Sequence, residues 1–273
     1  MARFPEIDFG LPGTVTERTA FGEVSEDEWG RYVLLKGVTP SDAHAPPFEM
    51  ALSAFERLES GLAAVGMDFS DVVRTWIYAG AILDWYPELN RARNAFFAAR
   101  GVYDRYIPAS TGIGWPEGRE ASISIGAFAA RGRHPGLVEV EALPSPLQCP
   151  AIEYGSSFSR AAEVRTPGWK RVIVSGTASI EPKSHDVAHP EDISRQIECT
   201  MNAVEAIYRS RGMSWKDVSG ALVYLKRESF RDAWERWLHT HPEYPVVHAR
   251  AIVADVCRAE WLFEIETDAT LWK

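Results

Sequence analysis

Apolar side chains recur every three or four residues in two stretches, residues 48–65 and residues 193–208, and this spacing predicts two amphipathic helices. The positions that define them are Leu52, Phe55, Leu58, Leu62, Val65, Ile197, Met201, Val204 and Ile207. Gly66 and Gly212 follow the two stretches, and glycine readily takes the left-handed backbone conformation in which many helices end. Each half of the chain is therefore expected to contain one long helix that ends at a glycine.

Alternating or continuous apolar runs predict strands around these helices. The expected strands are residues 31–38, 72–78 and 121–129 in the first half and residues 170–177, 218–225 and 261–269 in the second. A further helix with paired aromatic residues is expected in each half, at residues 87–99 and 230–238. The expected order in each half is β-β-α-β-α-β, which has one strand more than the three just given.

The two halves also share a sequence motif. Residues 66–78 are GMDFSDVVRTWIY and residues 212–224 are GMSWKDVSGALVY, so the motif recurs after 146 residues. A repeat at about half the chain length indicates a duplicated domain. The stretch between the halves is rich in proline, at Pro135, Pro144, Pro146 and Pro150. We expect an N-terminal domain at residues 1–132, a linker at residues 133–150 and a C-terminal domain at residues 151–273.

Composition narrows the classes of function. The 273 residues are 46% apolar and 25% charged, which is ordinary globular usage and excludes a disordered chain. The net charge of −9 disfavours nucleic acid as a partner, because an acidic surface repels phosphate backbones. No run of about 18 apolar residues occurs, and the N-terminus has no signal-peptide pattern. We therefore expect no membrane partner.

Metal and cofactor motifs are absent from the sequence. The three cysteines, Cys149, Cys199 and Cys257, form no CxxC pair, so they indicate no zinc ribbon, and free thiols suit a cytoplasmic location. Four histidines are considered as metal ligands, and they are His185, His189, His239 and His241. Their ligand sets are incomplete, and we expect no metal site. No GxGxxG, GK[ST], GxSxG or HExxH motif occurs, and we expect no cofactor.

Several segments of the second half resemble the Rid family, also called YjgF or L-PSP. They are YGSSFSRA at residues 154–161, VIVSGT at residues 172–177, the repeated GM…DV motif and FEIE at residues 263–266. The resemblance implies an α+β fold of two tandem Rid-like (chorismate-mutase-like) domains, each a mixed six-stranded sheet backed by two helices. It also implies a homo-oligomer, usually a trimer, with clefts between neighbouring domains.

The tandem arrangement and three short motifs resemble the chorismatase branch of that family. The motifs are STGIG at residues 110–114, SGTASI at residues 175–180 and VCR…EIE across residues 256–266. The branch hydrolyses chorismate without a cofactor, which implies a small dicarboxylate substrate and a role in secondary metabolism. Its products are pyruvate and either a cyclohexadiene diol acid or a hydroxybenzoate. Rid deaminases instead carry an Arg just after a Pro-Ala pair, whereas Ser110 follows that pair here.

Glu264 is the candidate catalytic acid. In the alternating strand WLFEIE, Glu264 and Glu266 share one face and the apolar residues share the other. A carboxyl beside an apolar wall keeps its proton more readily, and protonation of an enolpyruvyl ether needs such an acid. The resemblance gives this role to Glu264, because a Glu of this strand is the acid in chorismatases. The alternative is that both carboxylates are solvated on a polar face.

A dicarboxylate substrate needs cations placed for bidentate pairing, which Arg provides better than Lys. Arg250, Arg160 and Arg258 are the candidates, with Arg250 nearest the position of the Rid carboxylate anchor. His248 lies two residues before Arg250 and shares its face if the segment is extended. His248 could orient water or the ring hydroxyl, or pack in the core. Each arginine could instead be an ordinary surface charge.

Small residues complete the candidate site. The STGIG segment is expected to form a turn whose backbone N–H groups face an anion, through Ser110, Thr111, Gly112 and Gly114. Thr177 and Ala178 end a strand in the same way, and Trp115 is expected beside a ring-shaped ligand. The alternative for STGIG is an ordinary loop.

Two residues bear on the product. A Cys at the position of Cys257 is typical of hydroxybenzoate-forming chorismatases, whereas Ala178 resembles the diol-forming ones, and we favour a hydroxybenzoate. Cys257 could also be a small buried apolar residue. Two other functions stay open, a Rid-type imine or enamine deaminase and a noncatalytic small-ligand-binding protein. An endoribonuclease role is disfavoured by the negative charge.

Overall fold

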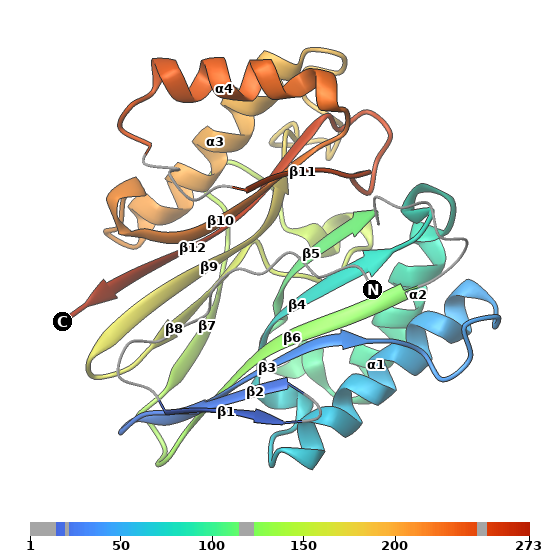
Figure 1. Ribbon diagram of the computed structural model, residues 1–273, viewed down its shortest axis with the longest axis vertical. Helices are drawn as coiled ribbons and strands as arrows, with labels where there is room; N and C mark the ends of the chain where they lie inside the picture. The colour runs from blue at the N-terminus through green and yellow to red at the C-terminus, as the bar shows by residue number, and fades with distance from the viewer. Residues whose placement is uncertain (1–14, 20–21, 115–122, 245–249) are drawn as a thin grey trace.

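Two six-stranded mixed sheets form the frame of the protein in a computed structural model that describes residues 15–19, 22–114, 123–244 and 250–273 (Figure 1). The strands of the first sheet are β1 (Val15–Thr19), β2 (Gly22–Glu26), β3 (Gly30–Val38), β4 (Val72–Ala79), β5 (Ala109–Gly114) and β6 (Ile123–Gly132). Their spatial order is β1-β2-β3-β6-β4-β5. Neighbouring strands are antiparallel except for β4 and β5, which are parallel.

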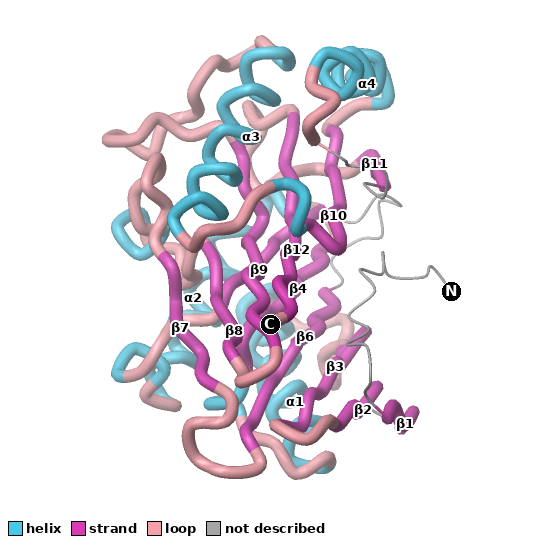
Figure 2. Tube along the Cα trace, turned by 90° about the vertical axis from the view of Figure 1, so that its left-hand side faces the viewer, coloured by secondary structure: helices cyan, strands magenta, loops and turns pink. Residues whose placement is uncertain are grey.

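The second sheet repeats this arrangement. Its strands are β7 (Glu139–Leu143), β8 (Ala161–Arg165), β9 (Trp169–Ala178), β10 (Val218–Leu225), β11 (Arg250–Val253) and β12 (Phe263–Trp272). The order β7-β8-β9-β12-β10-β11 matches the first sheet strand for strand, with β10 and β11 as the parallel pair. Figure 2 shows these strands side by side. The duplicated α+β fold expected from the repeat is confirmed.

Two helices cover the outer face of each sheet. They are α1 (Pro47–Ala64) and α2 (Ile82–Ala99) on the first sheet, and α3 (Ile193–Ser210) and α4 (Arg231–Thr240) on the second (Figure 1). Gly66 and Gly212 follow α1 and α3 with φ of 76° and 68°, as the helix-end pattern predicted. Among the described residues, no helix is both long and apolar enough to span a membrane.

The inner faces of the two sheets pack against each other. A single apolar cluster joins Tyr32 and Trp76 of the first sheet to Trp169 and Ile173 of the second. The opposite faces pack on the helices in two separate clusters. Both sheets are therefore buried on both sides, and every residue of β4 is buried. This explains why the central strands are continuous apolar runs rather than strict alternations.

Each half contains more strands than the sequence pattern indicated. The segment expected as a linker, residues 133–150, contains β7, which pairs with β8 from Glu139 opposite Arg165 to Leu143 opposite Ala161. The STGIG segment, expected as a turn, is the parallel strand β5. Edge strands such as β7 carry charged residues, and β5 is made of small residues, so neither shows strong apolar alternation.

Candidate functional site

A pocket lies where β5 and α2 of the first half meet the second half. Its empty volume is about 550 Å³, a figure that includes the open solvent at its mouth. The first half contributes Ile77, Tyr86, Leu89, Arg93, Ser110 and Gly112. The second half contributes Tyr154, Phe158, Arg160, Gly176, Ala178, Ile180, Cys257, Arg258, Trp261 and Glu264. The duplicated domains thus build one composite site.

Strand β5 is the seam that holds the two halves at this site. The backbone N–H of Ser110 donates to the Ser175 hydroxyl (2.9 Å), and the N–H of Gly114 donates to the Asp255 carbonyl (2.7 Å). A Cβ at Gly114 would lie 2.7 Å from the Asp255 Cβ, so this contact requires glycine. Gly114 therefore joins the two halves and is not among the pocket residues.

Glu264 lies in the wall of the pocket, on the inner face of β12. Its side chain is only 4% exposed. Burial raises the pKa of the Glu264 carboxyl to about 8, with a further rise from the charge of Glu266 and an opposing effect from Arg160. Glu264 is therefore protonated near neutral pH, the state that an acid catalyst needs.

Gly176 makes the space that this carboxyl occupies. A Cβ at Gly176 would lie 2.1 Å from Oε1 of Glu264, so any other residue at this position would displace the carboxyl. The backbone N–H of Gly176 donates to the Thr111 hydroxyl across the seam (3.0 Å). Gly176 thus fixes the position of Glu264 between the halves.

A buried ionic network lies next to Glu264 on the same strand. Arg74 on β4 donates to Glu266, to Asp268 (3.1 Å) and to the Thr111 hydroxyl (2.9 Å). Glu266 also accepts from Tyr224 (3.0 Å). Arg74, from the opposite sheet, thus pairs with both Glu266 and Asp268 and compensates the acidic face of β12 beside Glu264.

Arginine and aromatic side chains alternate along the pocket. The guanidinium of Arg160 lies 5.4 Å from the Phe158 ring and 5.5 Å from the Tyr154 ring. The guanidinium of Arg93 lies 5.8 Å from the same Phe158 ring, and the guanidinium of Arg258 lies 5.5 Å from the Tyr154 ring. We call Arg93, Arg160 and Arg258 the arginine row. These rings hold the arginine side chains through cation–π contacts.

The positive charge of this row lacks acidic partners. Within the described residues, none of Arg93, Arg160 and Arg258 forms a salt bridge, although Arg93 and Arg160 are each only 3% exposed. Nε of Arg93 is buried with no hydrogen-bond partner in the part of the chain described. Buried charges without partners are costly, and an anionic ligand would compensate them. The row is therefore suited to carboxylates.

Cys257 lines the same pocket as Glu264 and the three arginines. Burial raises the pKa of its thiol to about 12, with a further rise from the charge of Glu264 and an opposing effect of a hydrogen bond with Tyr86. The thiol is therefore neutral near pH 7 and is a weak hydrogen-bond donor rather than a thiolate nucleophile.

The structure brings most of the expected site residues together. Those that line the pocket are Glu264, Cys257, Arg160, Arg258, Ser110, Gly112 and Ala178. Thr111 belongs instead to the Arg74 network, and the Thr177 hydroxyl donates to the Ser175 carbonyl (2.8 Å). His248 and Trp115 lie outside the described residues.

Arg250, expected as a carboxylate anchor, is exposed and does not line the pocket. It opens β11, which is the edge strand of the second sheet and is separated from β12 by β10. The expectation placed Arg250 by its sequence distance from the Rid anchor, whereas the strand order decides which residues reach the pocket. Arg93, from the first half, lines the pocket instead.

Sequence reasoning missed Arg93 and the pocket aromatics. Arg93 follows Leu89 by four residues and precedes Phe96 by three, so it is a charge on the apolar face of a helix, which is the signal that could have identified it. Tyr154 and Phe158 belong to the YGSSFSRA segment, where they counted only toward the resemblance.

Comparisons with known proteins agree with this architecture. A crystal structure of chorismatase matches 93% of this chain and 78% of its own, with a TM-score of 0.69 and 20% identity. A Rid family protein from Yersinia pestis (15% identity, TM-score 0.41) and YjgF from E. coli (20%, 0.37) cover 49% and 47% of this chain and 100% and 97% of their own. No protein-family model and no curated protein sequence matches the chain. The chain has the chorismatase fold.

Proposed function

We propose that the protein is a chorismatase-like hydrolase, which cleaves the enolpyruvyl ether of chorismate or a close analogue. The observation that carries the proposal is the buried Glu264 carboxyl, whose pKa is raised to about 8, in a pocket that also holds three arginines without salt-bridge partners among the described residues. A neutral carboxyl supplies the proton that an enol ether needs, and the arginines suit a substrate with two carboxylates. The chorismatase fold supports the same chemistry.

Glu264 begins the reaction by giving its proton to the terminal methylene carbon of the enolpyruvyl group. The ether carbon becomes an oxocarbenium, which a water molecule attacks. The water loses a proton to the Glu264 carboxylate, which restores the acid. The resulting hemiketal transfers its hydroxyl proton to the ring oxygen and collapses to pyruvate and the ring alcohol. No cofactor is needed for any of these steps.

The arginine row orients the substrate for this proton transfer. We assign one substrate carboxylate to Arg160, whose charge also acts on the pKa of Glu264. We assign the other substrate carboxylate to Arg93 or Arg258. Guanidinium groups bind carboxylates in a bidentate way, which fixes direction as well as affinity. The Trp261 ring lies 4.9 Å from the guanidinium of Arg258 and also lines the pocket.

Cys257 and Ala178 line the same pocket, which supports a product-directing role for both. We propose a hydroxybenzoate product, formed when the released diol acid loses one ring hydroxyl and a ring hydrogen as water and becomes aromatic, with the neutral Cys257 thiol able to contact the ring. Chromatography of the aromatic product distinguishes it from the diol acid. We further propose a homotrimer that acts in the cytoplasm, in keeping with three free cysteines.

Pyruvate release from chorismate, followed with a coupled lactate dehydrogenase, tests the proposed function. The Glu264→Gln variant should lose at least about 100-fold in kcat, because the amide is far too weak an acid to protonate the substrate. Glu260→Gln is the matched control, since this exposed residue lies four positions away and outside the pocket.

Folded wild-type protein that releases no pyruvate from chorismate would contradict the proposal. An active Glu264→Gln enzyme would contradict the acid assignment alone. A rise in melting temperature with chorismate, without turnover, would instead identify a binding protein.

A further inference from the structure

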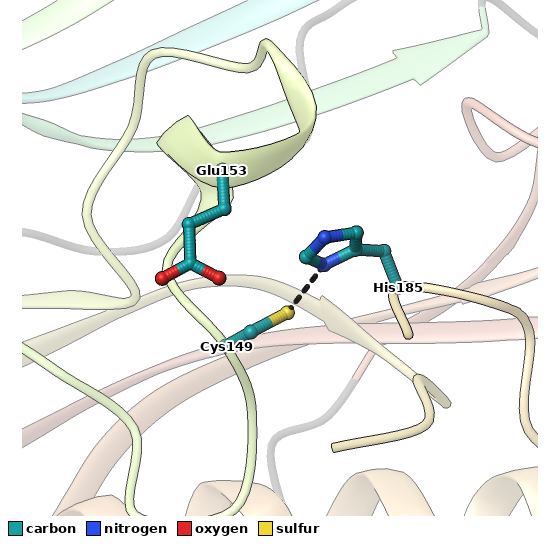
Figure 3. A group of neighbouring side chains, drawn as sticks. All are labelled: Cys149, Glu153 and His185. Atoms are coloured by element: carbon teal, nitrogen blue, oxygen red, sulfur yellow. Dashed lines mark hydrogen bonds between the residues drawn. The ribbon is translucent and has the colours of Figure 1, made fainter. Parts of the chain in front are cut away.

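A cysteine, a glutamate and a histidine meet behind the arginine row. Sγ of Cys149, a carboxylate oxygen of Glu153 and a ring nitrogen of His185 all lie within 4.8 Å of one another (Figure 3). Sγ of Cys149 and Nδ1 of His185 are in hydrogen-bond contact at 2.8 Å. None of the three side chains lines the catalytic pocket.

Two separate segments bring these side chains together. Cys149 comes just before the short 3-10 helix η3 (Ala151–Tyr154), which carries Glu153. His185 lies in the loop that a bridge between Ile180 and Val187 closes. The separation of 36 positions between Cys149 and His185 hides this proximity from the sequence, where only histidine pairs were considered.

The donor set determines which cation would fit. A thiolate, an imidazole and a carboxylate are the side chains that bind Zn²⁺, whereas Mg²⁺ and Ca²⁺ require oxygen ligands. A tetrahedral zinc holds its sulfur and nitrogen ligands roughly 3.5 Å apart, so the Cys149–His185 pair needs to open by less than about 1 Å. Glu153 is exposed and gives the ion a path from solvent.

We propose that Cys149, Glu153 and His185 bind one Zn²⁺, with water in the fourth position. This revises the sequence expectation that the chain has no metal site. The ion would tie the segment before β8 to the loop after β9, because its ligands come from both.

The site is connected to the pocket through the backbone of its own ligands. The Cys149 carbonyl accepts two hydrogen bonds from Arg160, at 2.9 and 2.7 Å, and the His185 carbonyl accepts one from Arg258 at 2.6 Å. Tyr154, next to Glu153, lies between the two guanidinium groups and 5.1 Å from the His185 ring. Bound zinc therefore fixes the carbonyls that position both arginines.

Zinc titration of the full chain tests the site directly. The reduced protein, stripped with a chelator, is titrated with zinc in competition with a chromogenic chelator. We expect one Zn²⁺ per chain, and a loss of at least about 100-fold in affinity for Cys149→Ser, since even outer-shell changes cost 10- to 100-fold. Cys199→Ser on α3 is the matched control and should bind as wild type.

Cobalt substitution identifies the ligands. Wild type and Cys199→Ser should show a near-ultraviolet thiolate-to-cobalt charge-transfer band, and Cys149→Ser should not. If Cys149→Ser does not fold, as circular dichroism would reveal, His185→Gln provides the second variant. Folded wild type that binds no zinc, or equal affinity in wild type and the folded ligand variants, overturns the proposal.

A consequence for substrate binding rests on the proposed function. Removal of zinc should raise the KM for chorismate at least severalfold and change kcat less, because the arginines lose their anchored carbonyls. The two proposals fail separately. Zinc binding without chorismate turnover would leave the metal site standing and remove the function, and turnover without zinc binding would do the reverse.

Discussion

At the scale of single residues, the proposed chemistry depends on one buried carboxyl whose pKa the protein raises. Glu264 is buried beside Glu266, and both effects disfavour its ionised form. Arg160 opposes them but does not dominate. The pocket thus combines a carboxyl of raised pKa with three guanidinium groups.

This arrangement predicts the pH dependence of turnover. Glu264 must carry its proton, and its pKa is raised from 4.5 to about 8, so kcat/KM should hold steady below pH 8. Above that pH the rate should fall about tenfold per unit as the carboxyl ionises. A pH–rate profile for pyruvate release measures this. A profile that falls already between pH 5 and 6 would mean that the carboxyl is not the acid, or that its pKa is not raised.

Gly176→Ala should impair catalysis by Glu264 although Glu264 itself is unchanged. The new methyl group would overlap Oε1 of Glu264, so the carboxyl must move away from its position beside the ligand. We expect kcat to fall by at least about tenfold, while the melting temperature drops by only a few degrees. Steady-state kinetics and thermal denaturation provide the measurements.

Gly112→Ala is the matched control, because a Cβ there meets nothing within 4 Å. It adds a methyl group at the pocket and should affect KM rather than the pH profile. Equal kcat values for the two alanine variants would show that Gly176 does not position Glu264.

At the scale of elements, β12 differs from the other central strands because its inner face is acidic. Glu264, Glu266 and Asp268 alternate with the buried apolar residues Phe263 and Ile265. The facing strand β4 supplies Arg74, whose guanidinium pairs with Glu266 and Asp268 and compensates their buried charge. The pairing of the two strands across the sheets is therefore ionic at its centre and apolar around it.

Arg74→Met should destabilise the fold strongly. It leaves Glu266 and Asp268 buried without their cation, and breaking such a pair costs about 3–5 kcal/mol. Urea unfolding measures the loss. Arg195→Ala, which removes an exposed ion pair with Asp192, is the control and should cost less than about 1 kcal/mol. Similar losses for the two variants would mean that the buried network contributes no more than a surface pair.

At the scale of the whole molecule, the two halves have become unequal. The second half supplies Glu264, Cys257 and two of the arginines, and the first half supplies Arg93 and the β5 seam. Duplication thus provides two packed sheets, and the site forms where one copy closes on the other.

Arg93→Ala tests whether the first half takes part in binding. If Arg93 meets a substrate carboxylate, its loss removes a charged hydrogen bond of about 1.5–3 kcal/mol, which corresponds to a KM raised roughly 10- to 100-fold. Arg91→Ala, two residues away on the exposed side of α2 and paired with Glu88, should leave KM unchanged. Equal KM values for both variants would confine the binding function to the second half.

The sequence by itself determined the duplication, the helices and central strands, and the shared face of Glu264 and Glu266. These features follow from local backbone periodicity, which is written into neighbouring residues. Only the tertiary structure decided that β7 belongs to the second sheet, that Arg250 lies at an edge, and that Arg93 reaches the pocket. Such contacts, like the one between Arg74 and Glu266 across 192 positions, depend on how two sheets pack, and no local pattern encodes that.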